Sequence, residues 1–194
     1  MHYIFAHASE SHIAGTGLNA DQFKGVFIDP KFEQAVSYIY PPIIGQPQWN
    51  LEDDDTFLEF AHGIFQFNIK NYKEVMPIRL ASYFYPSHIL PIFKLDHLKE
   101  VASVFGYEPK AKTTGEKLYQ YNKIITDELR LYATNRYDQS DIFYHLMFGN
   151  NLLKSIADGK TLSDVTKNSK QRWIKDYTRK AYDILLKLGS IEDK

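Results

Sequence analysis

The chain has 194 residues, of which 44% are hydrophobic and 24% are charged, and its formal net charge at pH 7 is −1. This composition is ordinary for a globular protein and supplies enough apolar side chains for a sizeable core. Cysteine is absent, which excludes disulfides and thiolate metal sites and fits a cytoplasmic protein. We expect neither a signal peptide nor a membrane helix, because no basic leader and no run of about 20 apolar residues occurs.

The two halves of the chain differ in charge. Residues 1–100 contain 7 basic and 12 acidic residues, whereas residues 101–194 contain 16 basic and 12 acidic residues. A dedicated nucleic-acid domain is usually more basic than this. The asymmetry nevertheless indicates a local basic surface in the C-terminal half, with an ordinary mixed surface as the alternative.

The first 45 residues have the weakest pattern for regular structure, and we expect them to be largely irregular. The segment HYIFAHA, residues 2–8, alternates loosely and fits a short strand. The segment GTGLNADQFKG, residues 15–25, is typical of a loop or turn because of its three glycines. A helix is expected to begin only at Asp29, because aspartate is a good N-cap and the following proline suits the first helical position.

From there onward, apolar side chains recur three and four positions apart, which places them on one face of a helix. Prolines and glycines interrupt this period and mark the expected ends of helices. The predicted helices cover residues 29–40, 50–72, 76–85, 94–106, 115–135, 140–160 and 161–190. Ser140 is the expected N-cap of the sixth helix, and Gly149 is a candidate break within it. We therefore predict a mainly α, helical bundle-like fold with residues 1–194 in a single domain.

A linker with two prolines separates the third and fourth predicted helices. Pro86 and Pro91 each restrict the preceding residue to extended geometry. The apolar side chains of this linker are expected to be pinned across the core, away from water; they are Ile89, Leu90, Ile92 and Phe93.

The C-terminal segment 161–194 is predicted as a basic helix with two different faces. Its apolar stripe consists of Trp173, Tyr177, Ala181, Ile184, Leu185 and Leu188. Its opposite face carries six basic residues, which are the candidate nucleic-acid-binding residues: Lys167, Lys170, Arg172, Lys175, Arg179 and Lys180. Such cations suit the phosphates of nucleic acid, and exposed aromatic rings stack on bases. The alternative is a solvated charged face above a buried aromatic core.

No motif in the chain predicts a catalytic, metal or cofactor site. His2, His7 and His12 recur every five residues, a period that matches neither a helix face nor a strand face. The acidic run at residues 52–55 suits the positive end of a helix dipole, and consecutive helical residues point in different directions, so they do not share one ion. The glycines of GTGLNA, residues 15–20, lack the buried strand that a dinucleotide-binding loop follows.

We therefore expect a protein that is not an enzyme and has no cofactor. The alternative is a helical enzyme with an unrecognised site. Such a site would bring histidines and carboxylates together in a deep pocket, and its candidate histidines are His62, His88, His97 and His145.

Residues 79–108, RLASYFYPSHILPIFKLDHLKEVASVFGYE, resemble a segment of McrB-type restriction proteins. The residues that carry the resemblance are Arg79, Leu80, Tyr83 or Tyr85, Pro86, Ile89, Leu90, Pro91, Ile92, His97 and Leu98. Residues 116–130 and 141–148 also resemble the helix and the aromatic segment that come next in that family, so that the similarity spans about residues 75–148. It departs at Leu95, where the family often has a serine or threonine cap, and it includes no motor domain.

The resemblance implies a helical module that lies beside a DNA-recognition element and ahead of an AAA+ motor, with no catalytic residues to carry over. Our hypothesis is a non-catalytic, cytoplasmic module of a bacterial restriction or phage-defence system that binds DNA or docks a motor subunit. The alternative is a protein–protein interaction module without a nucleic-acid role, which would expose an apolar patch.

Overall fold

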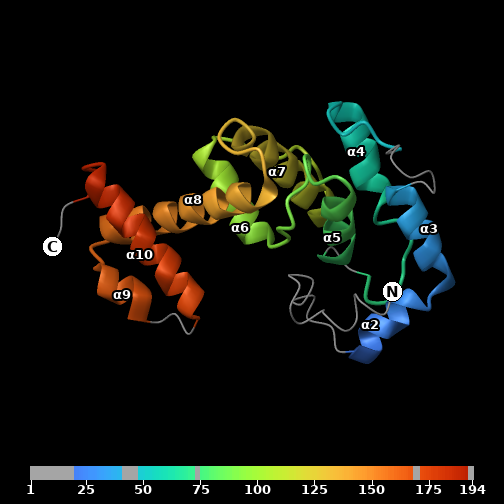
Figure 1. Ribbon diagram of the computed structural model, residues 1–194, viewed down its shortest axis with the longest axis horizontal. Helices are drawn as coiled ribbons and strands as arrows, with labels where there is room; N and C mark the ends of the chain where they lie inside the picture. Colours follow the sequence, from blue (N-terminus) through green and yellow to red (C-terminus); the bar gives the residue numbers. More distant parts are fainter. Residues whose placement is uncertain (1–19, 41–47, 73–74, 168–170, 192–194) are drawn as a thin grey trace. The chain divides into compact units, whose positions relative to one another are not determined.

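The computed structural model describes residues 20–40, 48–72, 75–167 and 171–191 (Figure 1). Every regular element in these ranges is a helix, which confirms the prediction of a mainly α, bundle-like fold. The helices are α2 (Ala20–Phe27), α3 (Pro30–Ile39), α4 (Asp54–Gly63), α5 (Val75–Phe84), α6 (Leu95–Val104), α7 (Thr114–Leu129), α8 (Arg136–Ala157), α9 (Leu162–Lys167) and α10 (Arg172–Lys187). The short strand predicted at residues 2–8 lies outside the described residues.

The chain divides by its internal contacts into two compact units. The N-terminal unit comprises Met1–Phe93 and Lys110–Lys123, and the C-terminal unit comprises Lys94–Pro109 and Ile124–Lys194. Helix α7 contributes residues to both units. The prediction of a single domain stays a prediction, because a division by contacts does not test whether either unit folds alone.

Helix α2 corrects the loop and irregular structure predicted for residues 20–27, whereas α3, with Asp29 as its N-cap, confirms the helix predicted over residues 29–40. Helix α2 has only 8 residues, a length at which an isolated helix is not stable in water. Its Val26 is fully buried in a cluster with Phe32 and Ala35 of α3. Burial against α3 therefore stabilises a helix that the glycine-containing sequence does not favour on its own.

Helix α4 ends at Gly63, nine residues before the end of the predicted helix at residues 50–72. Two residues beyond it, Asn68 and Asn71, have positive φ angles of 48° and 68°. Asparagine tolerates this left-handed backbone better than most residues do, but a helix cannot continue through it. Apolar side chains recur at helical spacing beyond Gly63 because the turn that follows the helix also buries them; Ile69 is an example.

The C-terminal unit differs from the prediction at several helix boundaries, and α7 ends at Leu129, before the predicted residue 135. Helix α8 begins at Arg136, before the predicted Ser140, because the Asn135 side chain accepts hydrogen bonds from the amides of Tyr137 and Asp138 at 3.0 Å each. It also runs without a break through Gly149. The single C-terminal helix predicted from residue 161 onward is two helices, α9 and α10, on either side of residues 168–170, which lie outside the described part of the chain.

One side chain, Asn122 of α7, fixes the linker between α5 and α6. Its Oδ1 accepts from the Leu90 amide at 2.7 Å, and its Nδ2 donates to the carbonyls of Leu90 at 2.8 Å and Ile92 at 3.1 Å. Ile89 and Leu90 are fully buried, and Ile92 nearly so, while Phe93 is partly exposed. The predicted burial of the linker side chains is confirmed for Ile89, Leu90 and Ile92 within the N-terminal unit.

We predict that Asn122→Leu lowers the free energy of unfolding by about 3 kcal/mol or more, because it leaves three buried backbone groups without partners. Urea titration followed by circular dichroism measures the change. The control is Asn151→Leu on α8, where the side chain is exposed and the expected change is within about 0.5 kcal/mol. Equal effects of the two substitutions would contradict the role given to Asn122.

Two helical glycines should respond in opposite directions to alanine. At Gly149 an added Cβ meets only the Ala181 Cβ, at 4.0 Å, so Gly149→Ala should stabilise the protein by about 0.5–1 kcal/mol through helix propensity. At Gly63 the added Cβ would overlap the Tyr38 hydroxyl, and Gly63→Ala should destabilise by about 1–3 kcal/mol. Thermal unfolding of both variants tests this pair of predictions. A shift of both unfolding midpoints in the same direction would contradict the packing described around one of the two glycines.

Candidate nucleic-acid interface

Helix α10 crosses α8 in the C-terminal unit and is attached to it through Tyr177 (Figure 1). The Tyr177 hydroxyl donates to Asp141 Oδ1 at 2.6 Å, and its ring stacks on Phe148 with centroids 5.8 Å apart. Burial and the bond to Asp141 raise the pKa of Tyr177 to about 12, so the phenol remains a neutral donor at physiological pH. Thr178 and Ala181 are the buried residues of α10.

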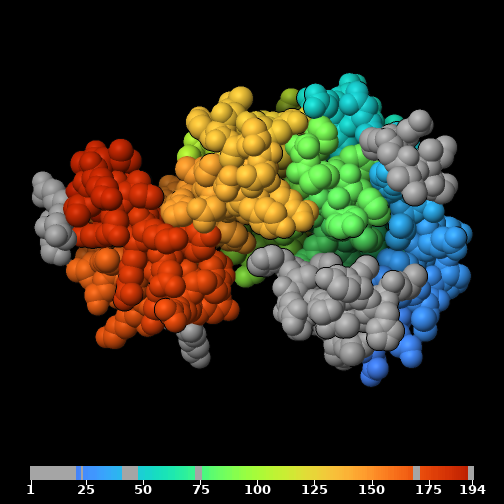
Figure 2. Space-filling model, in the orientation of Figure 1, coloured from blue at the N-terminus to red at the C-terminus, as the bar shows by residue number. Residues whose placement is uncertain are grey.

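The structure brings three of the six predicted binding residues together on the solvent face of α10. Arg172, Arg179 and Lys180 are exposed, and 95% of the Arg172 side chain is accessible. The Lys180 ammonium lies 5.6 Å from the centroid of the Tyr177 ring. Because α10 is held at its opposite side, these cations face water in a fixed arrangement. Figure 2 shows the surface of α9 and α10 in orange and red.

The other three predicted residues lie elsewhere. Lys175 is half-buried at the flank of α10, and Lys167 is exposed but belongs to α9. Lys170 falls outside the described residues. Lys187, which the sequence analysis did not single out, is exposed two turns after Lys180, and its spacing of seven residues was the signal that placed it on the same face.

The basic face also contains carboxylates that the prediction left out. Asp176 and Asp183 are exposed at positions that alternate with Arg172 and Arg179 along the helix. Asp176 Oδ2 lies 3.7 Å from Arg172 Nε, a loose surface ion pair. The face is therefore basic in excess but not uniformly positive.

The predicted apolar stripe of α10 is not fully buried, because two crossing helices cover only the residues near the crossing point. Trp173, Ile184 and Leu188 are exposed, while Ala181 of the same stripe is buried. The burial of Thr178 shows that the face toward α8 is rotated away from the predicted stripe. An apolar flank, defined as Trp173, Ile184 and Leu188, is consequently left beside the basic face.

An open hollow of about 290 Å³ lies at the start of α10, within the C-terminal unit. Trp173 and Phe148 form its aromatic wall. Its polar groups come from Lys94, Asp96, His97, Glu100, Asn151 and Gln171. Burial lowers the pKa of His97, and the nearby Lys94 lowers it further. His97 also packs edge-on against the Tyr144 ring, with centroids 6.3 Å apart.

The four candidate histidines of the alternative enzyme hypothesis have separate surroundings. His62 and His88 belong to the N-terminal unit, and His97 and His145 to the C-terminal unit. His145 Nδ1 lies 2.8 Å from the Asp141 carbonyl of its own helix, and its ring packs against Tyr177. In the described ranges, no three histidine or carboxylate side chains converge as ligands for a metal ion. The positions His2, His7 and His12 lie outside these ranges.

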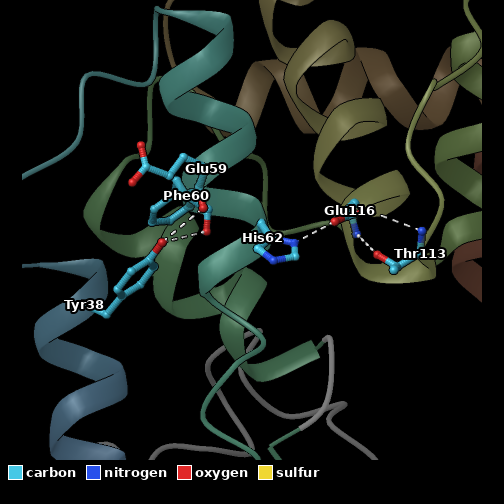
Figure 3. A network of polar contacts seen from close by, with 6 residues as sticks. All are labelled: Tyr38, Glu59, Phe60, His62, Thr113 and Glu116. Carbon is cyan, nitrogen blue, oxygen red and sulfur yellow. Dashed lines mark hydrogen bonds and ion pairs between the residues drawn. The ribbon is translucent and has the colours of Figure 1, made fainter.

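His62 takes part in a network that joins helices of the N-terminal unit (Figure 3). Its Nδ1 lies 2.9 Å from Glu116 Oε1, and Glu116 and Thr113 exchange hydrogen bonds at the start of α7, each at 3.2 Å. On the other side of α4, the Tyr38 hydroxyl donates to the Glu59 carbonyl at 3.1 Å. Each of these groups bonds to a helix end or to a neighbouring helix, so the network holds the helices together.

The acidic run at residues 52–55 also has a structural role, as expected. Asp53 is the N-cap of α4 and accepts from the Thr56 amide at 2.8 Å, and hydrogen bonds from Thr56 lower its pKa. Asp54 lies 3.2 Å from the Lys123 ammonium of α7.

Comparison of the chain with family models, with curated proteins and with solved structures finds no match. The resemblance to McrB-type proteins therefore stays a prediction. At its point of departure, α6 begins at Leu95 with Lys94 as N-cap and without a side-chain hydrogen bond at that cap. In the described part of the chain, no helix is both long enough and apolar enough to cross a membrane.

We predict that Glu116→Gln destabilises the protein at neutral pH and that its effect shrinks in acid. The hydrogen bond to His62, followed by those with Thr113, lowers the pKa of Glu116 from 4.5 to about 2. A depressed folded-state pKa stabilises the fold above the unfolded-state pKa, and this contribution is lost as the pH falls from about 4.5 through about 2. Urea titrations at several pH values between about 3 and 6 measure the difference from the parent protein.

The control for this prediction is Glu59→Gln, because the Glu59 carboxylate points away from the network (Figure 3). At neutral pH, Glu59→Gln should destabilise the protein less than Glu116→Gln does. A constant effect of Glu116→Gln across the range would contradict the assignment.

Proposed function

We propose that the chain is a non-catalytic DNA-binding module whose contact surface is the solvent face of α10. The observation that supports this most is the exposure of Arg172, Arg179 and Lys180 together on one rigidly attached helix. Residues 160–187, which include α9 and α10, contain eight basic and three acidic residues. Neutralisation of phosphates by such a cluster, with release of counterions, is the usual source of sequence-independent affinity.

The carboxylates on the same face limit this affinity. Phosphate would replace Asp176 as the partner of Arg172, and because the ion pair is exposed, the exchange costs little. Asp183 stays beside Arg179 and Lys180 and repels a backbone that lies along the whole helix. We therefore expect a micromolar interaction that is sensitive to salt, with contacts concentrated at Arg172, Arg179 and Lys180.

The wider role in a bacterial restriction or phage-defence system, beside an AAA+ motor, rests on the resemblance of residues 75–148 alone. The linker held by Asn122 fits that role, because the hydrogen bonds of Asn122 give its backbone one path. In this scheme the segment is a scaffold, and α10, which comes later in the chain, supplies the DNA contact.

A second candidate function is favoured by the apolar flank of α10. Trp173, Ile184 and Leu188 are exposed on one side of the helix, and aromatic and aliphatic anchors of this kind dominate the energetics of many protein interfaces. A protein-docking role for α10 predicts no binding to DNA at low salt.

The decisive experiment is fluorescence anisotropy with a labelled DNA duplex at about 50 and 200 mM salt. The combined substitutions Arg172→Glu, Arg179→Glu and Lys180→Glu should weaken binding at least tenfold. Loss of three phosphate contacts should also make the slope of log K against log salt less steep by about 2 to 3. Both changes are expected because the three cations are the proposed phosphate ligands.

The matched control reverses three exposed lysines outside α10, with Lys99→Glu, Lys110→Glu and Lys112→Glu. It changes the net charge by the same amount and should change affinity less than threefold. An equal loss of affinity in both variants would show that the interaction depends on net charge alone. Absence of binding at 50 mM salt would contradict the DNA-binding proposal and favour protein docking.

A further inference from the structure

Residues 130–137, which comprise the loop between α7 and α8 and the first two residues of α8, expose three large apolar side chains to water. Leu131, Tyr132 and Tyr137 are 75%, 72% and 68% exposed, and they lie within seven consecutive residues of the C-terminal unit. In Figure 1, residues 130–135 form the loop that joins the two helices. Large apolar residues exposed singly need no explanation, whereas a cluster of them indicates an interaction surface.

This aromatic loop, residues 130–137, is held in place by hydrogen bonds. The Gln139 side chain donates to the Ala133 carbonyl at 2.9 Å, and the Ala133 amide donates to the Leu129 carbonyl at 3.0 Å. The Asn135 side chain caps α8 immediately afterwards. Because the backbone is anchored at both ends and in its middle, Tyr132 and Tyr137 are presented to solvent at a small entropic cost for a ligand.

The segment carries two arginines, and carboxylates flank it on both sides: Asp127 and Glu128 precede it, and Asp138 follows it. Residues 130–137 contain Arg130 and Arg136 and no carboxylate. The Arg136 guanidinium lies 5.3 Å from the centroid of the Tyr137 ring, while Arg130 is paired with Asp127 at 2.5 Å. Aromatic rings interleaved with arginine form the kind of surface on which the bases of an unpaired strand stack while the phosphates meet the cations.

The loop adjoins the basic face of α10 through α8. Tyr137 and Asp141 lie one turn apart on α8, a rise of about 6 Å, and Asp141 binds Tyr177 of α10. Lys180 in turn lies over the Tyr177 ring. Helix α10 thus covers the α8 face from Asp141 onward and leaves Tyr137 exposed beyond its edge.

We infer that the C-terminal unit binds an unpaired nucleic-acid strand, with bases stacked on Tyr132 and Tyr137 and the backbone continuing to the cations of α10. This inference rests on the proposed function and specifies its ligand. The bases of a duplex are stacked on one another, so they offer no free faces to the tyrosines. The loop therefore adds affinity for an unpaired strand alone, whereas α10 attracts the phosphates of either form.

The test measures anisotropy of three labelled probes at about 50 mM salt: an oligothymidylate, an oligouridylate and a duplex of the same length. The parent should bind the unpaired probes more tightly than the duplex. The double variant Tyr132→Ala, Tyr137→Ala should weaken binding of the unpaired strands by about fivefold or more and leave the duplex within twofold. The variant Tyr132→Phe, Tyr137→Phe should bind like the parent, because phenylalanine retains the stacking face.

Both tyrosines are exposed, so the alanine variant should keep the thermal unfolding midpoint of the parent, which circular dichroism checks. Preference for the duplex, or an alanine variant that binds the unpaired strands like the parent, would overturn the inference. If charge reversal on α10 still abolished duplex binding in that case, the proposed function would stand. Absence of binding to all three probes would overturn both, and would leave the aromatic loop as a surface for a protein. The two unpaired probes distinguish DNA from RNA as the source of the strand.

Discussion

The N-terminal unit depends on the side-chain carboxamide of Asn122. This group supplies the linker after α5 with the hydrogen bonds that a helix or strand would otherwise provide, because the linker forms neither. Pro86 and Pro91 keep the linker after α5 out of regular structure, yet Ile89 and Leu90 within it are fully buried. A buried backbone without a hydrogen-bonding partner costs more than its apolar side chains gain. Asn122 resolves this conflict because asparagine carries a donor and an acceptor on one planar group, and it satisfies three backbone groups of the linker at once.

In the C-terminal unit the corresponding problem is the attachment of a helix that is amphipathic but covered only in part. Thr178 and Ala181 bury little apolar area, and the approach of Ala181 to Gly149 allows the two helices to lie close together. The aromatic contacts and the hydroxyl of Tyr177 supply the specificity that this small contact lacks. A helix held in this way keeps much of its circumference in solvent, which is useful for a binding element and costly for a purely structural one.

The helical character of the chain could be predicted from its sequence because the period of three to four residues survives in every long segment. Helix ends were harder to predict. Asn135 and Ser140 are both good N-caps by type, and only the geometry of the backbone shows that Asn135 is the one used. Helix α2 was missed because its stability comes from the burial of Val26 against α3, a contact that local pattern does not contain.

In the candidate site, too, the spacing of residues in the sequence predicts some features, while others depend on tertiary packing. Helical spacing correctly grouped Arg172, Arg179 and Lys180, because the residues that share one solvated helix face are determined by the spacing alone. It could not reveal that Ile184 and Leu188 would be exposed, since this depends on where α8 crosses α10. The aromatic loop was also missed: Tyr132 falls within the helix predicted over residues 115–135, whereas α7 ends at Leu129 and Tyr132 is exposed.

The discontinuity of the N-terminal unit has a consequence for biosynthesis. Residues 110–123 belong to this unit, but α6 is made before them and belongs to the other. A nascent chain that has emerged only as far as residue 109 contains the whole linker but lacks Asn122. The Leu90 amide then has no side-chain hydrogen-bond acceptor. Because translation proceeds from the N-terminus at a finite rate, the first half of the protein must wait for the second before its interior can close. Any chaperone or ribosomal tunnel that shelters the chain does so while Ile89, Leu90 and Ile92 are still without their final partner.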